Sequence, residues 1–446
     1  MSGSALDPVH DPRHRISCPF SNSSLVTVVG KFQQRIKEDT KEAAMAFSWQ
    51  DLPGEIELDI LSRLPPKSIL RSRCVCKNWL SLFSNPSFIH KHLLHRNRTS
   101  DDDDDTLLIH NCARDSLRLH HGLSLLNLGN PKDPLTFNLN HPFPQRNNRC
   151  DMDLVGSING LVCLTSKTDS LVSILWNPAT KDCVNIPTPN LKFLPNQGGY
   201  SIGFCFDSLR NDYKILNVVW FNEDMELRPR PRVELYSVGT DCWREIEIEV
   251  ETPFEYLSTR CDTIVNGEPY WSAYFYGDPF VNVVWFDVGK EVFREGPQFL
   301  PEPFVFLQEP FVECLVNFEN SVAVIASAVW PPKGNWEDKI SLWVMEDDSS
   351  SWSMKFSAGP SSFMTLVGCS KKGEILFRLF GEHVLQLYNP KTQETCNIET
   401  DLEGLRIEFE KFKFQVSNYT ASLVPIRGFK QVEKEGTVGK RRKIEH

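Results

Sequence analysis

A unit that repeats along most of the chain constrains its fold more than any other feature. The unit is an apolar segment, a turn built of residues such as Asn, Asp, Gly, Pro and Thr, and a second short segment. Its reference positions are Trp176, Tyr236, Phe286, Val344 and Tyr388, which are spaced by 60, 50, 58 and 44 residues. These intervals overlap the ~40–50 residues of β-propeller blades once loop insertions are allowed. We therefore predict a propeller-like β domain and leave its blade number open.

Two further patterns predict paired strands within this region. An aromatic residue follows seven positions after Tyr236 and after Phe286, which fits two strands joined by a short turn. Three dipeptides that end in glycine introduce apolar strands elsewhere, namely Asn159-Gly160, Asn266-Gly267 and Lys372-Gly373. Because Asn-Gly is a strong hairpin signal, we expect tight turns at these positions.

The composition limits the classes of protein to which the chain can belong. Hydrophobic residues make up 41% and charged residues 24%, so the chain can bury a sizeable core and is not wholly disordered. The net charge of -10 argues against a nucleic-acid partner, since non-specific binding needs a basic surface. No run approaches the ~20 apolar residues that span a bilayer, so we expect no membrane partner.

Cysteine usage indicates the cellular compartment. The 13 cysteines are odd in number and scattered, and residues 1–47 lack the basic segment and long apolar core of a signal peptide. Free thiols of this kind are typical of a reducing compartment. We therefore expect the protein in the nucleus, the cytoplasm or both.

A helical pattern precedes the strand-rich region. The first predicted helix has an apolar residue at every fourth position, namely Leu52, Ile56, Ile60 and Leu64. Pro53 suits its first turn, and Pro65-Pro66 ends it because proline lacks the backbone N–H. Further helices are predicted from Ser68 to about Cys74, around Lys77–Leu80 and from Ser87 to Leu94. About fifty residues cannot bury so many apolar side chains alone, so the pattern predicts a partner.

Composition divides the chain into five segments. They are a flexible extension at 1–47, a helical domain at 48–95, a charged linker at 96–105, a β domain at 106–426 and a basic flexible tail at 427–446. The linker contains Asp101–Asp105, a run that we expect to be extended and solvated because like charges repel. The predicted fold class is α+β multidomain, with a small N-terminal all-α domain followed by a large all-β, propeller-like domain.

The order of three motifs in the helical region resembles the F-box. The motifs are Leu52-Pro53, Ile60-Leu61-Ser62-Arg63-Leu64-Pro65 and Val75-Cys76-Lys77-Asn78-Trp79. The resemblance implies helices that dock onto the adaptor subunit of Skp–cullin–F-box ubiquitin ligases. The adaptor-binding residues that it implies are Leu52, Pro53, Ile56, Ile60, Leu61, Leu64, Pro65, Ile69, Val75, Cys76 and Trp79. Glu57 and Ser72 depart from the family pattern, which commonly has apolar side chains there.

The β region resembles the F-box-associated domain, which is related to kelch-type propellers and found in a large plant group. The matching segments include Ser157-Ile158-Asn159-Gly160-Leu161, Trp176-Asn177-Pro178-Ala179-Thr180, Gly203-Phe204-Cys205-Phe206-Asp207, Asp212-Tyr213-Lys214 and Tyr236-Ser237-Val238-Gly239-Thr240. Together the resemblances imply the substrate receptor of a ubiquitin ligase, with a Skp-type adaptor, a cullin and a target protein as partners. Such a receptor is not an enzyme and needs no cofactor, because it acts by proximity.

Two other functions stay open. The chain could be a propeller-type enzyme or small-molecule sensor that carries a helical dimerisation segment, or an F-box scaffold that works outside a ligase. Adaptor binding by residues 48–98 alone distinguishes the receptor from the enzyme, which does not need it.

The residues predict no catalytic centre and no metal site. Gly199-Tyr200-Ser201-Ile202-Gly203 fits the nucleophile elbow of hydrolases in letters, but a strand follows it where an elbow requires a helix. His92 and His95 share a helix face without a His-Glu-x-x-His motif, which favours a solvated helix end. Cys74 and Cys76 lie two apart within a predicted helix, where we expect small core or interface residues.

The tail and the loops carry the remaining predictions. A compact basic cluster, Lys440, Arg441, Arg442 and Lys443, fits either a nuclear-import signal or a solubilising tail. Loops such as 222–232 and 330–337 are expected to determine which target binds, and the sequence does not identify that target.

Overall fold

The computed structural model describes most of the helical and strand-rich regions. The described residues are 53–98, 105–114, 119–129, 135–139, 152–166, 172–191, 198–221, 231–247, 254–275, 281–299, 311–330, 337–346, 351–358, 364–379, 384–398 and 413–426. Leu52, Asp101–Asp104, the extension at 1–47 and the basic cluster at 440–443 lie outside them. What was predicted for those residues, and the five segment boundaries, stay predictions.

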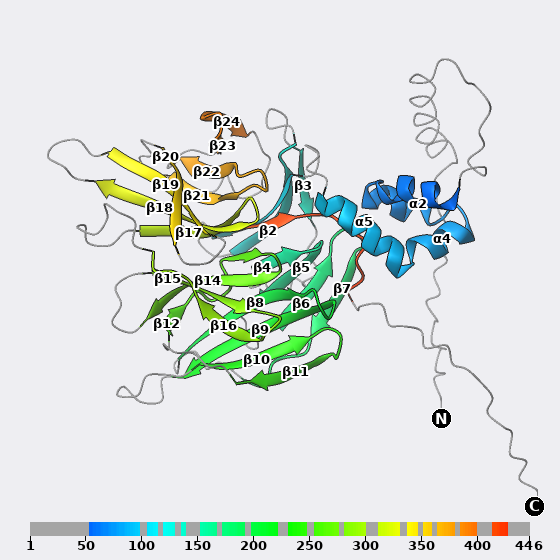
Figure 1. The fold of residues 1–446 in the computed structure, drawn as a ribbon, viewed down its shortest axis with the longest axis horizontal. Helices are drawn as coiled ribbons and strands as arrows, with labels where there is room; N and C mark the ends of the chain where they lie inside the picture. The colour runs from blue at the N-terminus through cyan, green and yellow to red at the C-terminus, as the bar shows by residue number, and fades with distance from the viewer. Residues whose placement is uncertain are drawn as a thin grey trace, which may run out of the picture. The chain divides into compact units, whose positions relative to one another are not determined.

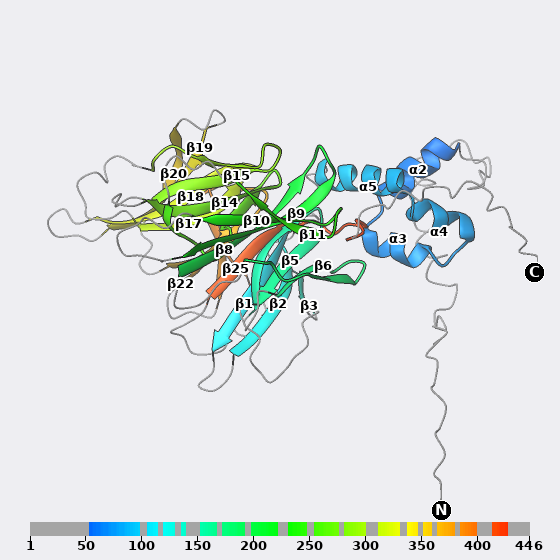
Figure 2. The ribbon, with the colours of Figure 1, turned by 90° about the horizontal axis from the view of Figure 1, so that it is seen from below.

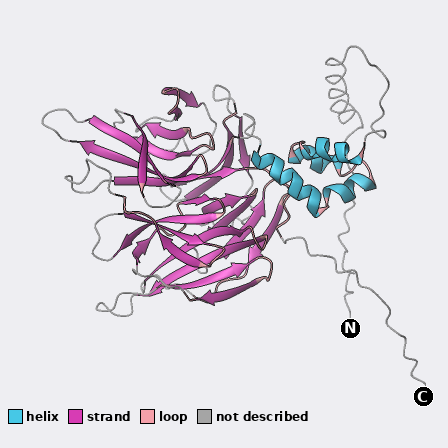
Figure 3. Ribbon diagram, in the orientation of Figure 1, coloured by secondary structure: helices cyan, strands magenta, loops and turns pink. Residues whose placement is uncertain are grey.

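The helices of the described chain all precede its strands (Figure 3). They are α2 (Gly54–Ser62), α3 (Pro66–Ser72), α4 (Lys77–Phe83) and α5 (Pro86–Arg98). α3 begins two residues before the predicted start because Pro66 occupies its first turn, where the missing N–H costs nothing. Pro86 opens α5 in the same way, and this helix continues past its predicted end at Leu94.

The strands form six antiparallel sheets, each of which is one blade of a β-propeller (Figure 1). Blade 1 consists of β25 (Lys413–Tyr419), β1 (Thr106–Arg114), β2 (Leu119–Asn127) and β3 (Leu135–Leu139). Blade 2 consists of β4 (Met152–Ile158), β5 (Leu161–Ser166), β6 (Val172–Asn177) and β7 (Asp182–Ile186). Blade 3 consists of β8 (Gly198–Asp207), β9 (Asp212–Phe221), β10 (Arg232–Ser237) and β11 (Cys242–Ile246). Blade 4 is β12-β14-β15-β16 (Phe254–Leu257, Glu268–Phe275, Val281–Asp287, Val292–Glu295) with β13 (Thr263–Val265) also paired to β14. Blades 5 and 6 are β17-β18-β19-β20 (Phe311–Phe318, Ser321–Trp330, Glu337–Met345, Trp352–Ala358) and β21-β22-β23-β24 (Met364–Cys369, Ile375–Leu379, Leu385–Asn389, Glu394–Ile398). The predicted fold class, a small all-α region followed by a large propeller-like β domain, is confirmed.

The innermost strands of the blades form a closed ring. Contacts run from β25 to β4, from β4 to β8, from β8 to β14, from β13 to β17, from β17 to β21 and from β21 back to β25. Blade 1 closes this ring because it joins strands from both ends of the propeller sequence. Its β25 pairs with β1 from Lys413 opposite Cys112 to Tyr419 opposite Thr106, and Figure 2 shows the orange β25 beside the cyan β1.

Gln415 on β25 adds buried hydrogen bonds to this closure. Its Oε1 accepts a hydrogen bond from the Leu154 N–H at 2.6 Å and lies 2.8 Å from Nδ1 of His110. Its Nε2 donates to Oδ1 of Asp153 at 3.0 Å. One side chain therefore connects β25 to β1 in its own blade and to β4 in the next.

The apolar core lies between neighbouring blades. Leu107 and Ile109 of blade 1 belong to one buried cluster with Leu376 and Leu387 of blade 6. Similar clusters lie between blades 1 and 2, 4 and 5, and 5 and 6. Each of these sheets is therefore buried on the faces that its neighbours cover, as in other stacked sheets.

One turn recurs after the third strand of four blades. The carbonyl of the first turn residue accepts a hydrogen bond from the N–H of the fifth at 2.7 or 2.8 Å, in the pairs Asn177–Lys181, Ser237–Asp241, Asp287–Glu291 and Asn389–Gln393. The fifth residue has a positive φ in each case. This turn brings residues seven apart face to face, so Tyr236 lies opposite Trp243 and Phe286 opposite Phe293. The predicted pairing is confirmed, and the five reference positions all lie on third strands.

The connections between strands divide the propeller into two faces. Because strand direction alternates, connections after first and third strands lie on one face, and those after second and fourth strands lie on the other. The first face, which we call the turn face, carries short turns such as Asn159-Gly160 between β4 and β5. On the second, the loop face, β9 ends and β10 begins, as do β18 and β19; the residues that connect them, 222–230 and 331–336, lie outside the described residues.

The two Asn-Gly dipeptides form the expected hairpin turns. A substitution of Gly160 tests how much such a turn contributes to stability. The φ of Gly160 is +80°, and an added Cβ would lie 2.5 Å from Oγ of Ser422 and 2.6 Å from the carbonyl oxygen of Thr420. Gly160→Ala should lower the free energy of unfolding by about 1–3 kcal/mol, measured by denaturant titration. Gly289→Ala is the matched control because its nearest atom outside its chain neighbours is 3.6 Å away. Equal losses in the two variants would contradict this account.

Candidate partner-binding surfaces

The helical region is organised around a row of four rings. The ring centroids of Trp79 and Phe83 are 5.7 Å apart, those of Phe83 and Phe88 5.2 Å, and those of Phe88 and His92 6.3 Å. Phe83, Phe88 and His92 are buried, whereas Trp79 is half-buried. The row holds α4 against α5, and Arg73 donates a hydrogen bond to the Phe83 carbonyl at the end of α4.

The prediction of a solvated helix end is wrong for His92. Its side chain is fully buried, and its Nε2 lies 3.0 Å from the carbonyl oxygen of Leu64. Burial lowers the pKa of His92 to about 4, so the ring is neutral near pH 7 and donates this hydrogen bond through Nε2. His92 is therefore a core residue, and its distance in sequence from Leu64 hid this contact.

The prediction that Cys74 and Cys76 lie within a helix is also wrong. α3 ends at Ser72, both thiols are exposed, and Cys76 is the N-cap of α4. Its Sγ accepts a hydrogen bond from the Trp79 N–H at 3.4 Å. The predicted helix was expected to continue to about Cys74, but α3 ends at Ser72 and a short turn leads from there to α4.

Of the two departures from the F-box pattern, Ser72 is accommodated by a local hydrogen bond. Ser72 is buried, and its hydroxyl donates to the Ser68 carbonyl at 2.9 Å, so no polar group is left unpaired there. Glu57 lies half-buried on α2.

Large apolar side chains of the helical region face solvent. Ile56 on α2 is 48% exposed, Val75 in the turn before α4 is 52% exposed, and Leu80 on α4 is 49% exposed. Such side chains are candidates for contact with a partner.

The predicted adaptor-binding residues divide by exposure. Pro53, Ile56, Pro65, Val75 and Cys76 are exposed; Ile60, Leu64 and Trp79 are half-buried; Leu61 and Ile69 are buried. Leu80 was not among them, although its exposure equals that of Ile56. Adaptor contact by any of these residues stays a prediction.

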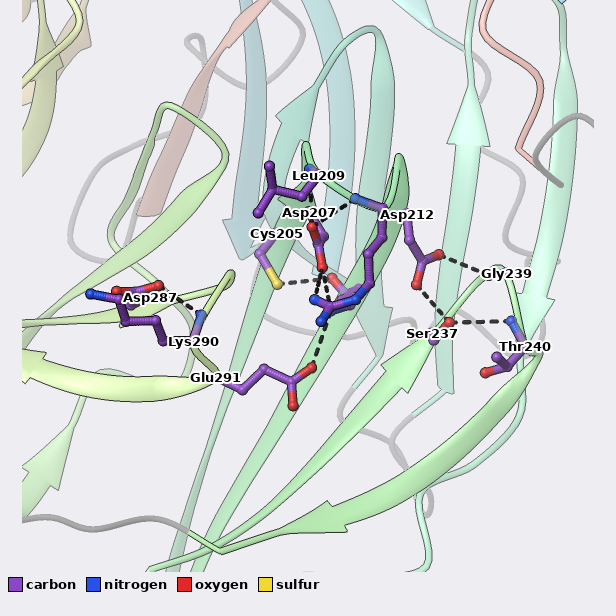
Figure 4. A network of polar contacts seen from close by, with 12 residues as sticks. Cys205, Asp207, Leu209, Asp212, Ser237, Gly239, Thr240, Asp287, Lys290 and Glu291 are labelled. Atoms are coloured by element: carbon purple, nitrogen blue, oxygen red, sulfur yellow. Dashed lines mark hydrogen bonds and ion pairs between the residues drawn. The ribbon is translucent and has the colours of Figure 1, made fainter.

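In the propeller, a chain of charged groups joins blades 3 and 4 on the turn face (Figure 4). Nζ of Lys214 lies 2.8 Å from Oδ2 of Asp207 and 3.2 Å from Oε1 of Glu291 in the next blade. Arg244 of blade 3 pairs with the same Glu291. Oδ1 of Asp207 also accepts hydrogen bonds from the N–H groups of Leu209 and Arg210, which fixes the turn between β8 and β9.

The pairing keeps these carboxylates charged. Burial disfavours ionisation of Asp207, but hydrogen bonds from Lys214 and Arg210 outweigh it and lower its pKa to about 2. Burial likewise opposes the charge of Glu291, whose pKa is lowered because Arg244 and Lys214 bind it. Every member of the network is paired with an opposite charge, so its role is to hold two blades together.

The hydrolase-like sequence is structural. Ser201 lies inside the uninterrupted strand β8, is fully buried, and accepts a hydrogen bond from Nε1 of Trp271 at 2.7 Å. No sharp strand-to-helix turn exposes it, as an elbow requires. Among the described residues there is also no cluster of three or more potential metal ligands, and no helix that is long and apolar enough to span a membrane.

The prediction of a solvated aspartate run is wrong for Asp105. Its side chain is 2% exposed, its Oδ1 accepts a hydrogen bond from the Lys371 N–H, and its carbonyl accepts one from Leu128. The chain thus enters the propeller in a buried position beside blade 6. The sequence places Asp105 in a run of five identical residues and so does not distinguish it from the other four.

The Asp207 network predicts a measurable dependence on pH. A carboxyl whose pKa is lower in the folded state stabilises the fold above its unfolded value of 3.8, and this contribution is lost as the pH falls toward about 2. Asp207→Asn should therefore reduce stability by about 2 kcal/mol at pH 6 and make the decline between pH 4 and pH 2 shallower. Unfolding titrations at several pH values measure this, and parallel curves for the two proteins would contradict it.

Comparisons with known proteins agree with the two regions described above. Residues 49–91 match the F-box domain, and residues 113–423 match the F-box associated beta propeller domain. F-box protein At3g07870 of Arabidopsis thaliana is 26% identical over 357 residues, which cover 73% of this chain and 77% of that protein. Two other relatives from this plant are 25% identical, F-box protein At1g52495 over 81% of this chain and 82% of its own length, and F-box/kelch-repeat protein At3g23880 over 71% and 81%. Because the propeller match covers more than half of the chain, the chain belongs to the family of F-box proteins with an F-box associated beta propeller domain.

Proposed function

We propose that this protein is the substrate receptor of a Skp–cullin–F-box ubiquitin ligase. An F-box domain implies binding to a Skp-type adaptor, and the match lies in the region where large apolar side chains face solvent. That coincidence carries the proposal. The exposed side chains of Ile56, Val75 and Leu80 are the first candidates for direct contact, whereas the buried Leu61 and Ile69 support the helices from inside.

The propeller offers a surface for the target protein. Its blades are joined by buried clusters and by the closure of blade 1, so the connections on the loop face are held by a rigid frame. Long connections on a rigid scaffold commonly carry binding specificity. We therefore assign target binding to the loop face, which includes the connections at 222–230 and 331–336.

In this function the receptor makes and breaks no covalent bond. It holds the target near the ubiquitin carrier that the adaptor and cullin bring, and so raises the local concentration of target lysines.

Adaptor binding tests the proposal. Val75→Ala with Leu80→Ala removes two exposed apolar side chains and should weaken binding to a Skp-type adaptor at least about 30-fold, since loss of an interface anchor costs ~2–4 kcal/mol. Ile56→Ala should weaken it separately, because Ile56 belongs to another helix. Calorimetric titration of the full chain with purified adaptor measures both effects.

Matched controls separate a lost contact from a lost fold. Glu55→Ala on α2 and Ser81→Ala on α4 alter exposed side chains and should change the affinity less than about threefold. All variants should keep the circular dichroism of the unaltered protein. Full affinity in the apolar variants, or no binding by the unaltered chain, would sink the receptor proposal and favour the scaffold, sensor or enzyme.

We also propose that the basic cluster at 440–443 is a nuclear-import signal. Replacing Lys440, Arg441, Arg442 and Lys443 by Ala removes the positive charge that an import receptor reads. A fluorescent fusion of this variant should shift from the nucleus to the cytoplasm while its adaptor affinity is unchanged. An unchanged distribution would leave the solubilising tail as the explanation.

A further inference from the structure

The innermost strand of blade 4 is broken, unlike those of the other blades. β12 ends at Leu257 and β13 begins at Thr263, and both pair with β14. Most of the segment between them, 258–261, leaves the sheet, whereas the Asp262 N–H still donates to the carbonyl of Tyr270 on β14 at 2.8 Å. The part that leaves the sheet is therefore free to make hydrogen bonds elsewhere.

Those hydrogen bonds go to β8 of blade 3. The Ile202 N–H donates to the carbonyl of Thr259 at 3.1 Å, and the Cys261 N–H donates to the carbonyl of Ile202 at 2.8 Å. β8 is the terminal strand of its sheet and uses its other edge to pair with β9. Its free edge belongs to the inner ring, so the broken segment lies along the axis of the propeller, with Arg260 paired to Ile202.

Arg260 forms no ion pair with an acid of the described part of the chain. Its side chain is half-buried, its Nη1 donates a hydrogen bond to the carbonyl of Cys261 at 3.0 Å, and no carboxylate of the described residues lies within 4 Å. A guanidinium has five N–H donors in a planar fork that matches an oxyanion. Most of this capacity is therefore open.

The acid that interacts electrostatically with Arg260 is Asp262, and its carboxyl group is hydrogen-bonded to other residues. Oδ2 of Asp262 accepts a hydrogen bond from the Ser272 N–H at 2.7 Å and another from Oγ of Ser258 at 3.3 Å. Burial raises the pKa of Asp262, which favours the uncharged carboxyl. A half-buried cation without a counter-ion is costly unless a ligand pairs with it.

We propose that Arg260 is the binding residue of an oxyanion site on the propeller axis, which takes the carboxylate or phosphate group of a small dissolved ligand. The inference does not depend on adaptor binding. The alternative is that Arg260 only fastens the broken segment through its hydrogen bond to Cys261.

Protection from chemical modification tests the site in the unaltered full chain. Phenylglyoxal modifies arginine side chains, and mass spectrometry of the digested protein follows Arg260 and the exposed Arg71 separately. Inorganic phosphate or citrate, each at ten times its Kd, should slow modification of Arg260 about tenfold compared with chloride at equal ionic strength. Arg71 should react at the same rate throughout. Protection by phosphate, by citrate or by both indicates which oxyanion the site takes.

A variant provides the second measurement. Arg260→Gln should abolish the rise in melting temperature that the protecting anion causes, whereas Arg71→Gln should retain it. Without anion, Arg260→Gln should melt at or above the temperature of the unaltered protein, because it removes an unpaired charge. No protection by either anion, equal protection of Arg71, or an anion effect that survives Arg260→Gln would overturn the site. A lower melting temperature without any anion effect would support the fastening role instead.

Discussion

The antiparallel pairing of β25 with β1 closes the ring of blades, and the remaining inter-blade contacts depend on it. The residues that it joins are far apart, since His110 and Gln415 are separated by 305 positions. Closing a loop costs about 0.6 kcal/mol more for each doubling of its length, so this contact costs about 3–4 kcal/mol more than a hairpin turn. A register of seven paired residues and the buried hydrogen bonds of Gln415 offset that cost. Without closure, blade 1 would lose a strand and blades 1, 2 and 6 would expose their shared clusters.

Closure also determines how the two faces can be used. The segment after β25 stays on the turn face, where Asn177 donates hydrogen bonds to the carbonyls of Ser422 and Val424 and Lys371 binds Thr420. Asp105 directly precedes β1 on the same face. Both ends of the propeller sequence and several tight turns thus lie on the turn face, and we propose that the longer connections of the loop face bind the target. The broken strand of blade 4 is the exception within the ring, because it brings a charged residue to the axis.

The sequence predicted the elements that repeat or follow local rules. The third strands of blades 2, 3, 4 and 6 were recognisable because the turn after them, with a positive φ at its fifth residue, requires polar or small residues at fixed spacing. The third strand of blade 5 was recognised from its apolar residues and its distance from the other units. Blade 1 was not, because its innermost strand lies at the far end of the chain and no local pattern indicates that pairing. The proline-bounded helices were recognised, but His92, Cys76 and Asp105 were misplaced. The position of each is determined by a contact or helix cap that forms only in the folded chain, so the neighbouring sequence did not predict it.

Hydrogen exchange of the native protein tests most directly whether ring closure holds the propeller together. If it does, the paired amides of β1 and β25 should open with the same free energy as those of β5 and β6 in the continuous blade 2, because all open in one global unfolding step. Amides of β25 that exchange at a much lower free energy, while those of blade 2 stay protected, would show that the ring persists without its closing strand and would contradict the account.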